Sequence, residues 1–283
     1  MSFDVSISVI IRTRNSDTVL RRCLASLKQQ KNVSFDIIVV DSGSTDDTLL
    51  IAKAFECKVI PYPISDFAFN YSRALNLGIQ QANGENILIV SSHVWLPNPN
   101  SVQWMLDKLH EDAAIKAVSL SRSKDVEQLT KEIQTPYGAR ITQDQFKGEG
   151  MYNYCSLIRK ADWEKRSFRE DLPTCEDQEW IWHWMKSSNA CSYIFEVPLA
   201  GYDNPNYNFA KDVQEYYTMG KYVYPYYSSF SFLKELYKIA FQNFKKRRLQ
   251  KARHYFLLAN TLLRYKFLPP SSIQSDDYLK KII

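Results

Sequence analysis

The sequence predicts an α/β fold with a mainly parallel central sheet, followed by a helical C-terminal extension. Short apolar, β-branched runs alternate with segments of helical periodicity through the first 120 residues. Polar residues follow directly after several of these runs, and the chain from residue 209 onward reads as two or three helices. Alternation of strands and helices is typical of a parallel sheet covered by helices on both faces.

The first half of the chain carries the clearest pattern. Apolar, β-branched runs predict strands over residues 5–11, 35–40, 59–60 and 87–90, and helical spacing of apolar residues predicts helices over 18–30, 46–55 and 70–82. Pro61 and Pro63 stop the third strand, and Asn83 with Gly84 ends the third helix. This half therefore predicts four parallel strands with three intervening helices.

After Pro97 the pattern loosens. Residues 99–110 and 175–186 are expected to be helical, residues 117–120 and 153–159 to be strands, and residues 121–150 to form a polar loop or lid. Residues 209–266 are expected to form the helical extension. These elements divide the chain into a first domain over 1–208 and a basic, aromatic-rich helical extension over 209–283.

Composition excludes several classes of protein. The chain has 283 residues, of which 45% are hydrophobic and 24% charged, as in ordinary globular proteins. It has no apolar run long enough to span a membrane, and its first residues do not resemble a secretory signal. The five cysteines are widely spaced without a C-x-x-C pair, so we expect reduced thiols in a cytoplasmic protein rather than disulfides or a zinc knuckle.

The net charge of +5 is unevenly distributed. Residues 231–283 contain 12 Lys/Arg and 3 Asp/Glu, which gives this segment a net charge of +9. The rest of the chain is therefore slightly acidic. A basic, aromatic-rich helix can lie on an anionic membrane, or it can be a solvated helix packed on the first domain. Nucleic-acid binding is not expected, because no recognised nucleic-acid-binding fold precedes this segment.

Three polar segments should converge on one crevice, because ligands of open α/β sheets bind at the carboxyl ends of the strands. These segments are residues 12–15, 41–44 and 91–93. Asp41 directly follows a strand, and residues 42–45 form a tight turn that opens a helix. Asp41 can accept hydrogen bonds from a ribose or a base, while Ser44 or Thr45 can simply cap the helix. The D-x-G-x-T spacing from Asp41 also fits a phosphotransferase, although no second phosphate loop is found.

Several motifs, in order, resemble family-2 glycosyltransferases, the inverting enzymes of the GT-A fold. They are V-I-I-R-T-R-N at 9–15, I-V-V-D-S-G-S-T-D at 38–46, A-L-N-L-G-I at 74–79, P-N at 97–98 and E-D-Q-E-W at 176–180. Residues 69–76, 91–93 and 171–173 look most like a bacterial, rhamnosyltransferase-like branch. The resemblance covers about residues 5–210. It implies a Rossmann-like nucleotide-diphospho-sugar transferase domain over 1–208.

The resemblance implies a site for a nucleotide-diphosphate sugar donor. Thr13 and Asp41 fall where the family binds the nucleoside. Arg73 lies two residues before the position of the usual arginine, which is Leu75 here, and is expected to reach the base or the pyrophosphate from the neighbouring helical turn. Ser91 begins the segment that aligns with the metal-binding D-x-D.

That segment departs from the family pattern, because Ser91, Ser92 and His93 replace both carboxylates. His93 can bind a divalent cation, donate a hydrogen bond to the pyrophosphate, or only pack. Imidazole suits Mn²⁺ better than Mg²⁺. Many relatives carry a histidine after the last strand, and here Asp203 is the nearest substitute, as a second metal ligand or as part of an Asp-Asn-Pro turn. The resemblance thus leaves metal dependence open.

Asp177 falls at the position of the family's general base. A carboxylate there takes the proton of the acceptor hydroxyl as its oxygen attacks the anomeric carbon. Glu176 and Asp177 can alternatively only favour the start of a helix. Glu176 and Trp180 are expected to contact the acceptor or to support the site.

The leading hypothesis is an inverting glycosyltransferase of bacterial surface polysaccharide biosynthesis (capsule or O-antigen). Its acceptor would be a saccharide or a polyprenyl-linked saccharide, and it would act in the cytoplasm with peripheral contact to the inner face of the cell membrane. The missing D-x-D motivates a second hypothesis, a non-catalytic nucleotide-sugar-binding or scaffold protein. A phosphotransferase that depends on Asp41 is the third.

Overall fold

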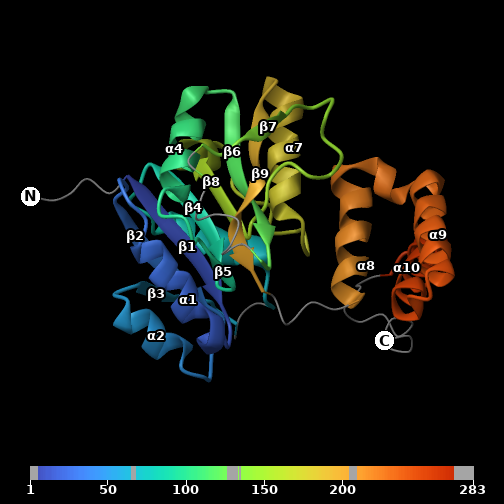
Figure 1. Ribbon diagram of the computed structural model, residues 1–283, viewed down its shortest axis with the longest axis horizontal. Coiled ribbons are helices and arrows are strands. Elements are labelled where there is room, and N and C mark those ends of the chain that lie inside the picture. The colour runs from blue at the N-terminus through green and yellow to red at the C-terminus, as the bar shows by residue number, and fades with distance from the viewer. Residues whose placement is uncertain (1–5, 65–67, 126–132, 134, 204–208, 271–283) are drawn as a thin grey trace, which may run out of the picture. The chain divides into compact units, whose positions relative to one another are not determined.

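The computed structural model describes residues 6–64, 68–125, 133, 135–203 and 209–270. The chain forms two compact units, each described by itself below (Figure 1). The first comprises residues 1–171 and 176–204, and the second comprises residues 172–175 and 205–283. No helix of the described residues is both long enough and apolar enough to cross a membrane.

The described residues of the first unit form one sheet of nine strands, with helices packed around it (Figure 1). Its strands are β1 (Ile7–Thr13), β2 (Phe35–Asp41), β3 (Lys58–Pro61), β4 (Asn86–Ser91), β5 (Val94–Trp95), β6 (Ile115–Ser123), β7 (Gly138–Ile141), β8 (Cys155–Arg159) and β9 (Cys191–Tyr202). The order is β3-β2-β1-β4-β8-β6-β9-β5, with β7 paired to β9. The predicted strands of the first half are confirmed, and β3-β2-β1-β4 is the parallel part of the sheet.

The second part of the sheet is mixed. β8 runs antiparallel between β4 and β6, whereas β6 and β9 are parallel. The register of β6 against β9 shifts after Leu120, which pairs with Phe195, while Ser121 pairs with Pro198 and Arg122 with Ala200. The extra residues in β9 therefore form bulges beside the end of β6. Bulges commonly change the direction in which a nearby side chain points.

Helices cover both faces of this sheet, because the strand residues that point to either face are apolar and buried. The helices of the first unit are α1 (Asp17–Lys28), α2 (Thr48–Ala54), α3 (Tyr71–Gln80), α4 (Ser101–Glu111), α6 (Lys160–Lys165) and α7 (Glu176–Ser188). α1, α2 and α4 share one apolar core with Val9 and Val39. α3 packs on the opposite face, where a Cβ on Gly78 would lie 2.6 Å from Ile10. Glycine at position 78 thus lets the helix approach the sheet closely.

Four elements were not predicted: β5, β7, α6 and β9. β7 lies inside the expected loop of residues 121–150, of which 126–132 and 134 lie outside the described residues. β5 has two residues and pairs with the end of β9. A two-residue strand and a strand interrupted by bulges do not maintain the alternation on which prediction from sequence depends.

The second unit is helical, as expected. It contains α8 (Phe209–Thr218), α9 (Phe230–Lys245) and α10 (Leu249–Phe267), with a π-helix over Met219–Val223 and a 3₁₀ turn over Pro225–Ser228 between α8 and α9. Its core includes Val213 from α8, Leu236 from α9, and Leu258 with Tyr265 from α10.

Candidate active site

Thr13 and Asp41 end the neighbouring parallel strands β1 and β2 and are register partners. The Thr13 hydroxyl donates to Oδ1 of Asp41 at 2.9 Å. The other Asp41 oxygen accepts the main-chain N–H groups of Gly43 at 3.0 Å and Ser44 at 2.9 Å, and the Ser44 hydroxyl donates to Oδ1 at 2.5 Å. Asp41 is buried. Its carboxylate therefore holds the turn that follows β2 in one conformation.

The turn is fastened from β1 as well. Asn15 has a left-handed φ of 47° and donates its main-chain N–H to the Ser44 hydroxyl at 2.8 Å. Its side-chain oxygen accepts the N–H of Thr45 at 2.8 Å. Gly43 has a φ of 86°, a conformation that glycine adopts without strain. The two strand ends thus form one hydrogen-bonded rim at the carboxyl edge of the sheet.

Ser91 ends β4 and lies beside the segment that leads into β8. Its N–H donates to the carbonyl of Tyr154 at 3.0 Å, and its hydroxyl donates to the carbonyl of Asn153 at 3.4 Å. The Ser92 hydroxyl lies 3.1 Å from that of Ser16, just before α1. The segment that replaces D-x-D therefore joins the rim to residues 153–154.

His93 and Asp203 are brought together through the main chain. The N–H of Asp203 donates to the carbonyl of His93 at 3.2 Å, and the His93 ring packs edge-on against Tyr202 at 4.8 Å between centroids. The Asp203 side chain is 67% exposed and lies 3.9 Å from the ammonium of Lys124.

A divalent cation fits these side chains poorly. Mg²⁺ at a diphosphate is usually held by one or two carboxylates together with phosphate oxygens and water. Here the described edge offers one exposed carboxylate, Asp203, and the ammonium of Lys124 beside it opposes a second cation. The described residues contain no cluster of three or more His, Cys, Asp or Glu that could hold a metal. The two metal ligands predicted from the sequence are therefore neighbours without forming a metal centre in the described part of the chain.

Asp177 lies in the first turn of α7 and faces residues 150–153. Its Oδ2 accepts the N–H of Asn153 at 3.0 Å, and its Oδ1 accepts the N–H of Gln178 at 2.8 Å. The side chain of Gln178 accepts the N–H of Gly150 at 2.8 Å and donates to the carbonyl of Met151, which fixes this loop against the helix.

Burial raises the pKa of Asp177 to about 7, and the neighbouring charge of Glu176 adds to the effect. The two N–H groups and the guanidinium of Arg12 oppose it by favouring the charged form. Asp177 nevertheless keeps part of its surface exposed to solvent. An accessible carboxylate that titrates near neutral pH is suited to accept a proton.

Glu176 is buried and supports this carboxylate from behind. Its Oε1 accepts a hydrogen bond from Arg12 at 3.2 Å and from the side-chain amide of Asn153 at 2.9 Å. The Arg12 guanidinium also stands over the ring of Tyr71, 4.9 Å from its centroid. Arg12 thus connects β1 to α7 and to the first turn of α3.

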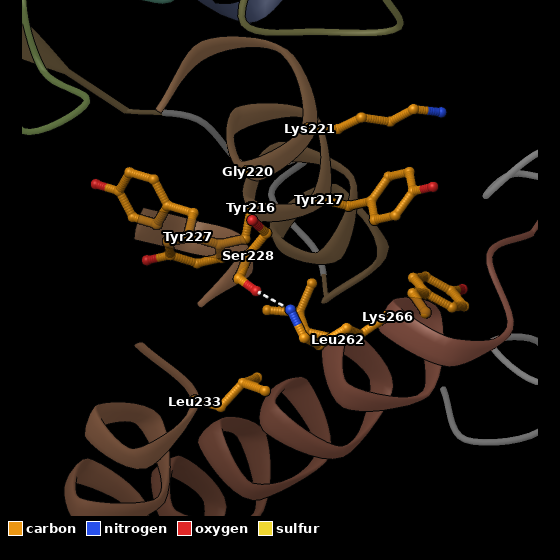
Figure 2. A pocket seen from close by; sticks show the side chains of 10 residues that line it. Tyr216, Tyr217, Gly220, Lys221, Tyr227, Ser228, Leu233, Leu262 and Lys266 are labelled. Atoms are coloured by element: carbon orange, nitrogen blue, oxygen red, sulfur yellow. Dashed lines mark hydrogen bonds between the residues drawn. The ribbon is translucent and has the colours of Figure 1, made fainter. Parts of the chain in front are cut away.

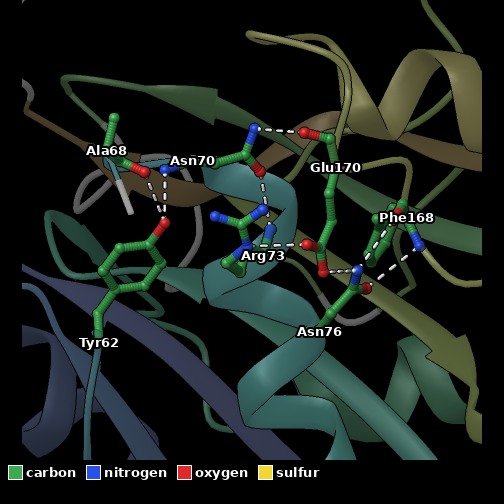
Figure 3. A network of polar contacts seen from close by, with 7 residues as sticks. All are labelled: Tyr62, Ala68, Asn70, Arg73, Asn76, Phe168 and Glu170. Atoms are coloured by element: carbon green, nitrogen blue, oxygen red, sulfur yellow. Dashed lines mark hydrogen bonds and ion pairs between the residues drawn. The ribbon is translucent and has the colours of Figure 1, made fainter. Parts of the chain in front are cut away.

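Arg73 belongs to a polar network between α3 and residues 168–170 (Figure 3). Its Nε donates to Glu170 at 2.8 Å, and the other oxygen of Glu170 accepts the amide of Asn76 at 3.0 Å. Asn70 caps α3 by accepting the N–H of Arg73 at 2.9 Å and donates to the carbonyl of Glu170 at 2.9 Å. The structure therefore gives Arg73 a carboxylate partner at the start of α3.

Trp180 is wholly buried, and its indole N–H donates to the carbonyl of Arg166 at 2.7 Å. Arg166 in turn binds both oxygens of Glu179, at 2.8 and 3.0 Å. Trp182 stacks on Phe146, with 4.7 Å between the ring centroids. Trp180 therefore holds α7 in place rather than facing solvent.

Aromatic residues and one arginine that the sequence analysis did not single out complete the edge. The rings of Tyr152 and Tyr154 stack with 5.1 Å between centroids, and Tyr154 meets Tyr202 edge-on at 5.6 Å. The guanidinium of Arg122, near the end of β6, lies 3.9 Å from the centroid of Tyr202 and 4.7 Å from that of Tyr154. Arg12 was expected at this edge as part of residues 12–15 but was given no role, and Asn153 was not predicted as a site residue.

The second unit contains a separate pocket of about 280 Å³ (Figure 2). Four tyrosines and two lysines are among its lining residues, and Lys266 donates to the carbonyl of Ser228 at 2.8 Å. None of the site residues predicted from the sequence lines it. The pocket is therefore distinct from the polar edge described above.

The model of glycosyl transferase family 2 matches residues 8–166. Chondroitin synthase of Pasteurella multocida is 30% identical over 139 residues, which are 47% of this chain and 14% of that protein. Glycosyltransferase GlyA of Streptococcus pneumoniae is 32% identical over 119 residues, which are 42% of this chain and 17% of that protein. The matches thus span less than a fifth of either relative.

Solved structures with the same fold cover nearly the whole chain. Mannosyltransferase PcManGT from Pyrobaculum calidifontis, in complex with GDP-Man and Mn²⁺, has a TM-score of 0.60 at 14% identity, over 96% of this chain and 77% of that one. S. aureus TarS 1-349 in complex with UDP-GlcNAc has a TM-score of 0.58 at 16% identity, over 96% of this chain and 93% of that one. These likenesses confirm the predicted GT-A fold, and the family model covers more than half of the sequence. The chain belongs to glycosyl transferase family 2.

Proposed function

We propose that the chain is an inverting glycosyltransferase that moves a sugar from a nucleotide-diphosphate donor to a saccharide or polyprenyl-linked acceptor in bacterial surface polysaccharide biosynthesis. The observation that carries this proposal is Asp177, a partly exposed carboxylate with a pKa of about 7 at the carboxyl edge of the sheet. The donors in complexes of the same fold, GDP-Man and UDP-GlcNAc, support the class of donor. The named product of chondroitin synthase supports the class of acceptor.

In the proposed reaction, Asp177 takes the proton of an acceptor hydroxyl. The oxygen forms a bond to the anomeric carbon while the bond from that carbon to the diphosphate oxygen breaks, and the nucleoside diphosphate leaves with the electron pair. One displacement inverts the anomeric carbon. Glu176 and Trp180 act as supports, since Glu176 binds Arg12 and Asn153 and Trp180 anchors α7.

The donor is proposed to lie along the rim of residues 13–15, 41–45 and 91–93. The nucleoside packs against Thr13 and the turn that Asp41 holds, and Ser91 and His93 face the diphosphate. Arg73 approaches the donor from the first turn of α3, where Glu170 fixes its guanidinium. On this proposal the first unit is the catalytic domain.

Asp177→Asn tests the proposal. Candidate donors are first identified by thermal shift with UDP-, GDP-, dTDP- and CMP-sugars, because a ligand at a hundred times its Kd stabilises the folded state by about 2.7 kcal/mol. With the donor found, Asp177→Asn is expected to lower transfer by about 10²-fold or more while leaving donor affinity unchanged. The matched control Glu164→Gln removes an exposed carboxylate on α6 and should keep full activity. Near-normal turnover of Asp177→Asn would make the base assignment wrong.

The same experiment separates the two alternatives. A non-catalytic scaffold binds nucleotide sugars but transfers nothing, and Asp177→Asn then changes no activity. A phosphotransferase that depends on Asp41 transfers phosphate from ATP and is insensitive to Asp177. The four hydrogen bonds that occupy the carboxylate of Asp41 argue against it as a nucleophile or base.

Peripheral contact with the inner face of the cell membrane is proposed for the second unit. Residues 236–270 contain nine Lys/Arg and no Asp/Glu. Lys245 ends α9, and the turn to α10 carries Lys246, Arg247 and Arg248. The exposed apolar side chains beside them are Phe241, Phe244 and Leu249. Cations beside exposed rings suit a surface of anionic lipid.

Sedimentation with vesicles tests this contact. The full chain is expected to bind vesicles that contain phosphatidylglycerol, to bind pure phosphatidylcholine weakly, and to be released by salt. Phe241→Ser with Phe244→Ser should reduce binding strongly. Leu50→Ser, which removes an exposed leucine of the first unit, is the control and should leave binding unchanged. Equal binding of both kinds of vesicle, or none, would contradict the proposal.

A further inference from the structure

The site lacks the carboxylates that hold a divalent cation, yet a departing nucleoside diphosphate needs positive charge to stabilise it. Ser91 ends β4, Ser92 and His93 follow it, and Asp203 lies 3.9 Å from the ammonium of Lys124. A divalent cation at a diphosphate takes one or two carboxylates besides the phosphate oxygens, and the one carboxylate at this edge already faces an ammonium. A fixed positive side chain that reaches the same edge can take the place of the cation.

Arg122 is in the right place to be that group. Its guanidinium lies over Tyr202 at 3.9 Å and Tyr154 at 4.7 Å, and the His93 ring packs on the same Tyr202. The N–H of Ser91 donates to the carbonyl of Tyr154. Arg122 and the segment that replaces D-x-D are thus in contact with the same two tyrosines.

Two further features favour a ligand for Arg122. Arg122 is exposed, and no carboxylate of the described residues forms an ion pair with it. The same holds for Arg14 just after β1, but it is Arg122 whose guanidinium stands on Tyr154 and Tyr202, the two tyrosines that flank residues 91–93. The bulges of β9 lie beside Arg122 and end its regular pairing. A side chain held by two aromatic faces without a counter-ion is poised to receive an anion.

Arg122 also shares a neighbour with the proposed base. The charges of Arg122 and Asp177 act in opposite directions on the pKa of Tyr152, which burial raises. Both groups therefore approach the same tyrosine at the carboxyl edge. Transfer needs a cation near the leaving diphosphate and a base near the acceptor in the same site. Arg122 and Asp177, which both act on Tyr152, meet that need.

We propose that Arg122 binds the diphosphate of the donor and fills the place of the divalent cation, so that donor binding and transfer do not require a metal. The inference rests on the proposed donor class. A guanidinium forms two parallel hydrogen bonds to phosphate oxygens and stays charged at any physiological pH. His93 flanks the same position through Tyr202.

Calorimetric titration of the full chain tests the inference. UDP, GDP, dTDP and CDP are titrated in EDTA and again with Mn²⁺, and the tightest binder is compared with its nucleoside, which lacks the phosphates. We expect affinities in EDTA and Mn²⁺ within about threefold. Arg122→Gln should weaken the diphosphate about tenfold or more and leave the nucleoside unchanged, since a hydrogen bond to a charged group is lost.

Two variants sharpen the reading. Arg122→Lys keeps the positive charge but loses the paired N–H groups of the guanidinium. Its affinity for the nucleoside diphosphate should therefore fall less than that of Arg122→Gln. Lys124→Gln removes an equal charge from the neighbouring exposed side chain and should change the affinity by less than twofold. Unchanged thermal unfolding of each variant verifies the fold.

The outcomes separate the two proposals. Diphosphate binding that gains tenfold or more from Mn²⁺ overturns the inference and leaves the proposed function standing. Equal losses for nucleoside and diphosphate in Arg122→Gln also overturn it. Absence of binding by all four nucleotides, in every condition, overturns the donor class and the inference together.

Discussion

The main-chain N–H of Asn153 donates to Oδ2 of Asp177 at 3.0 Å, while its side-chain amide donates to Glu176. One residue thus positions two consecutive carboxylates that have different tasks. Glu176 is tied to Arg12 and buried, and Asp177 keeps exposed surface. This division favours Asp177, rather than Glu176, as the proposed base.

Glu176→Gln should move the acidic limb of the pH–activity profile to lower pH. The charge of Glu176 raises the pKa of Asp177, and its removal leaves Arg12 to favour the ionised form. The pKa of the base therefore falls, and Asp177 is deprotonated at lower pH. The measurement is kcat/KM between pH 5 and 9. Glu164→Gln is the control, and a limb that stays in place for Glu176→Gln would contradict the proposed coupling.

Asp177→Asn should change how stability depends on pH. The pKa of Asp177 rises from 3.8 to about 7 on folding, so the folded chain binds this proton more tightly than the unfolded chain. The stabilisation of the folded state by this proton is complete below pH 4 and is lost as pH rises through 7. The free energy of unfolding of Asp177→Asn, relative to the unchanged chain, should therefore increase by about 2 to 4 kcal/mol between pH 4 and 8. Denaturant titrations at several pH values measure it, and a pH-independent difference would refute it.

Asp41→Asn should disrupt the rim. The substitution removes the charged acceptor of the N–H groups of Gly43 and Ser44. Its amide NH₂ then faces the hydroxyls of Thr13 and Ser44, which donate to Asp41 in the unchanged chain and must turn to accept. We expect a loss of about 1 to 3 kcal/mol in stability, from the lost charged acceptor, and much weaker nucleotide binding. Thermal unfolding and calorimetry measure the two effects. Asp47→Asn alters an exposed aspartate after the same turn and should change neither.

Gly43→Ala isolates backbone strain. The φ of Gly43 is 86°, and a Cβ there would meet no atom within 4 Å. The cost should therefore be about 1 to 2 kcal/mol, from the left-handed backbone alone. Gly78→Ala has no such φ, but its Cβ would lie 2.6 Å from Ile10, so its cost is steric. Chemical denaturation compares both, and a neutral Gly43→Ala would show that the turn can rearrange.

The first half of the fold could be predicted because each strand there is a continuous buried run bounded by a helix. Asp41, Ser91 and Asp177 could be located because they lie at a strand end or a helix start, which sequence marks. Arg122 and Tyr202 could not, because bulges and a two-residue strand bring them together. Asn153 could not be located either, because it binds Asp177 through its main-chain N–H, which almost every residue type has.

The irregular pairing of β6 with β9 separates two tasks within one sheet. From Ala117 to Leu120 the two strands keep one register and bury the core, and beyond Leu120 the extra residues of β9 shift it. Leu199 and Ala200, which follow these extra residues, are again fully buried in the core. The irregular stretch is therefore anchored on both sides, and its exposed residue Glu196 is where a change should cost the core least.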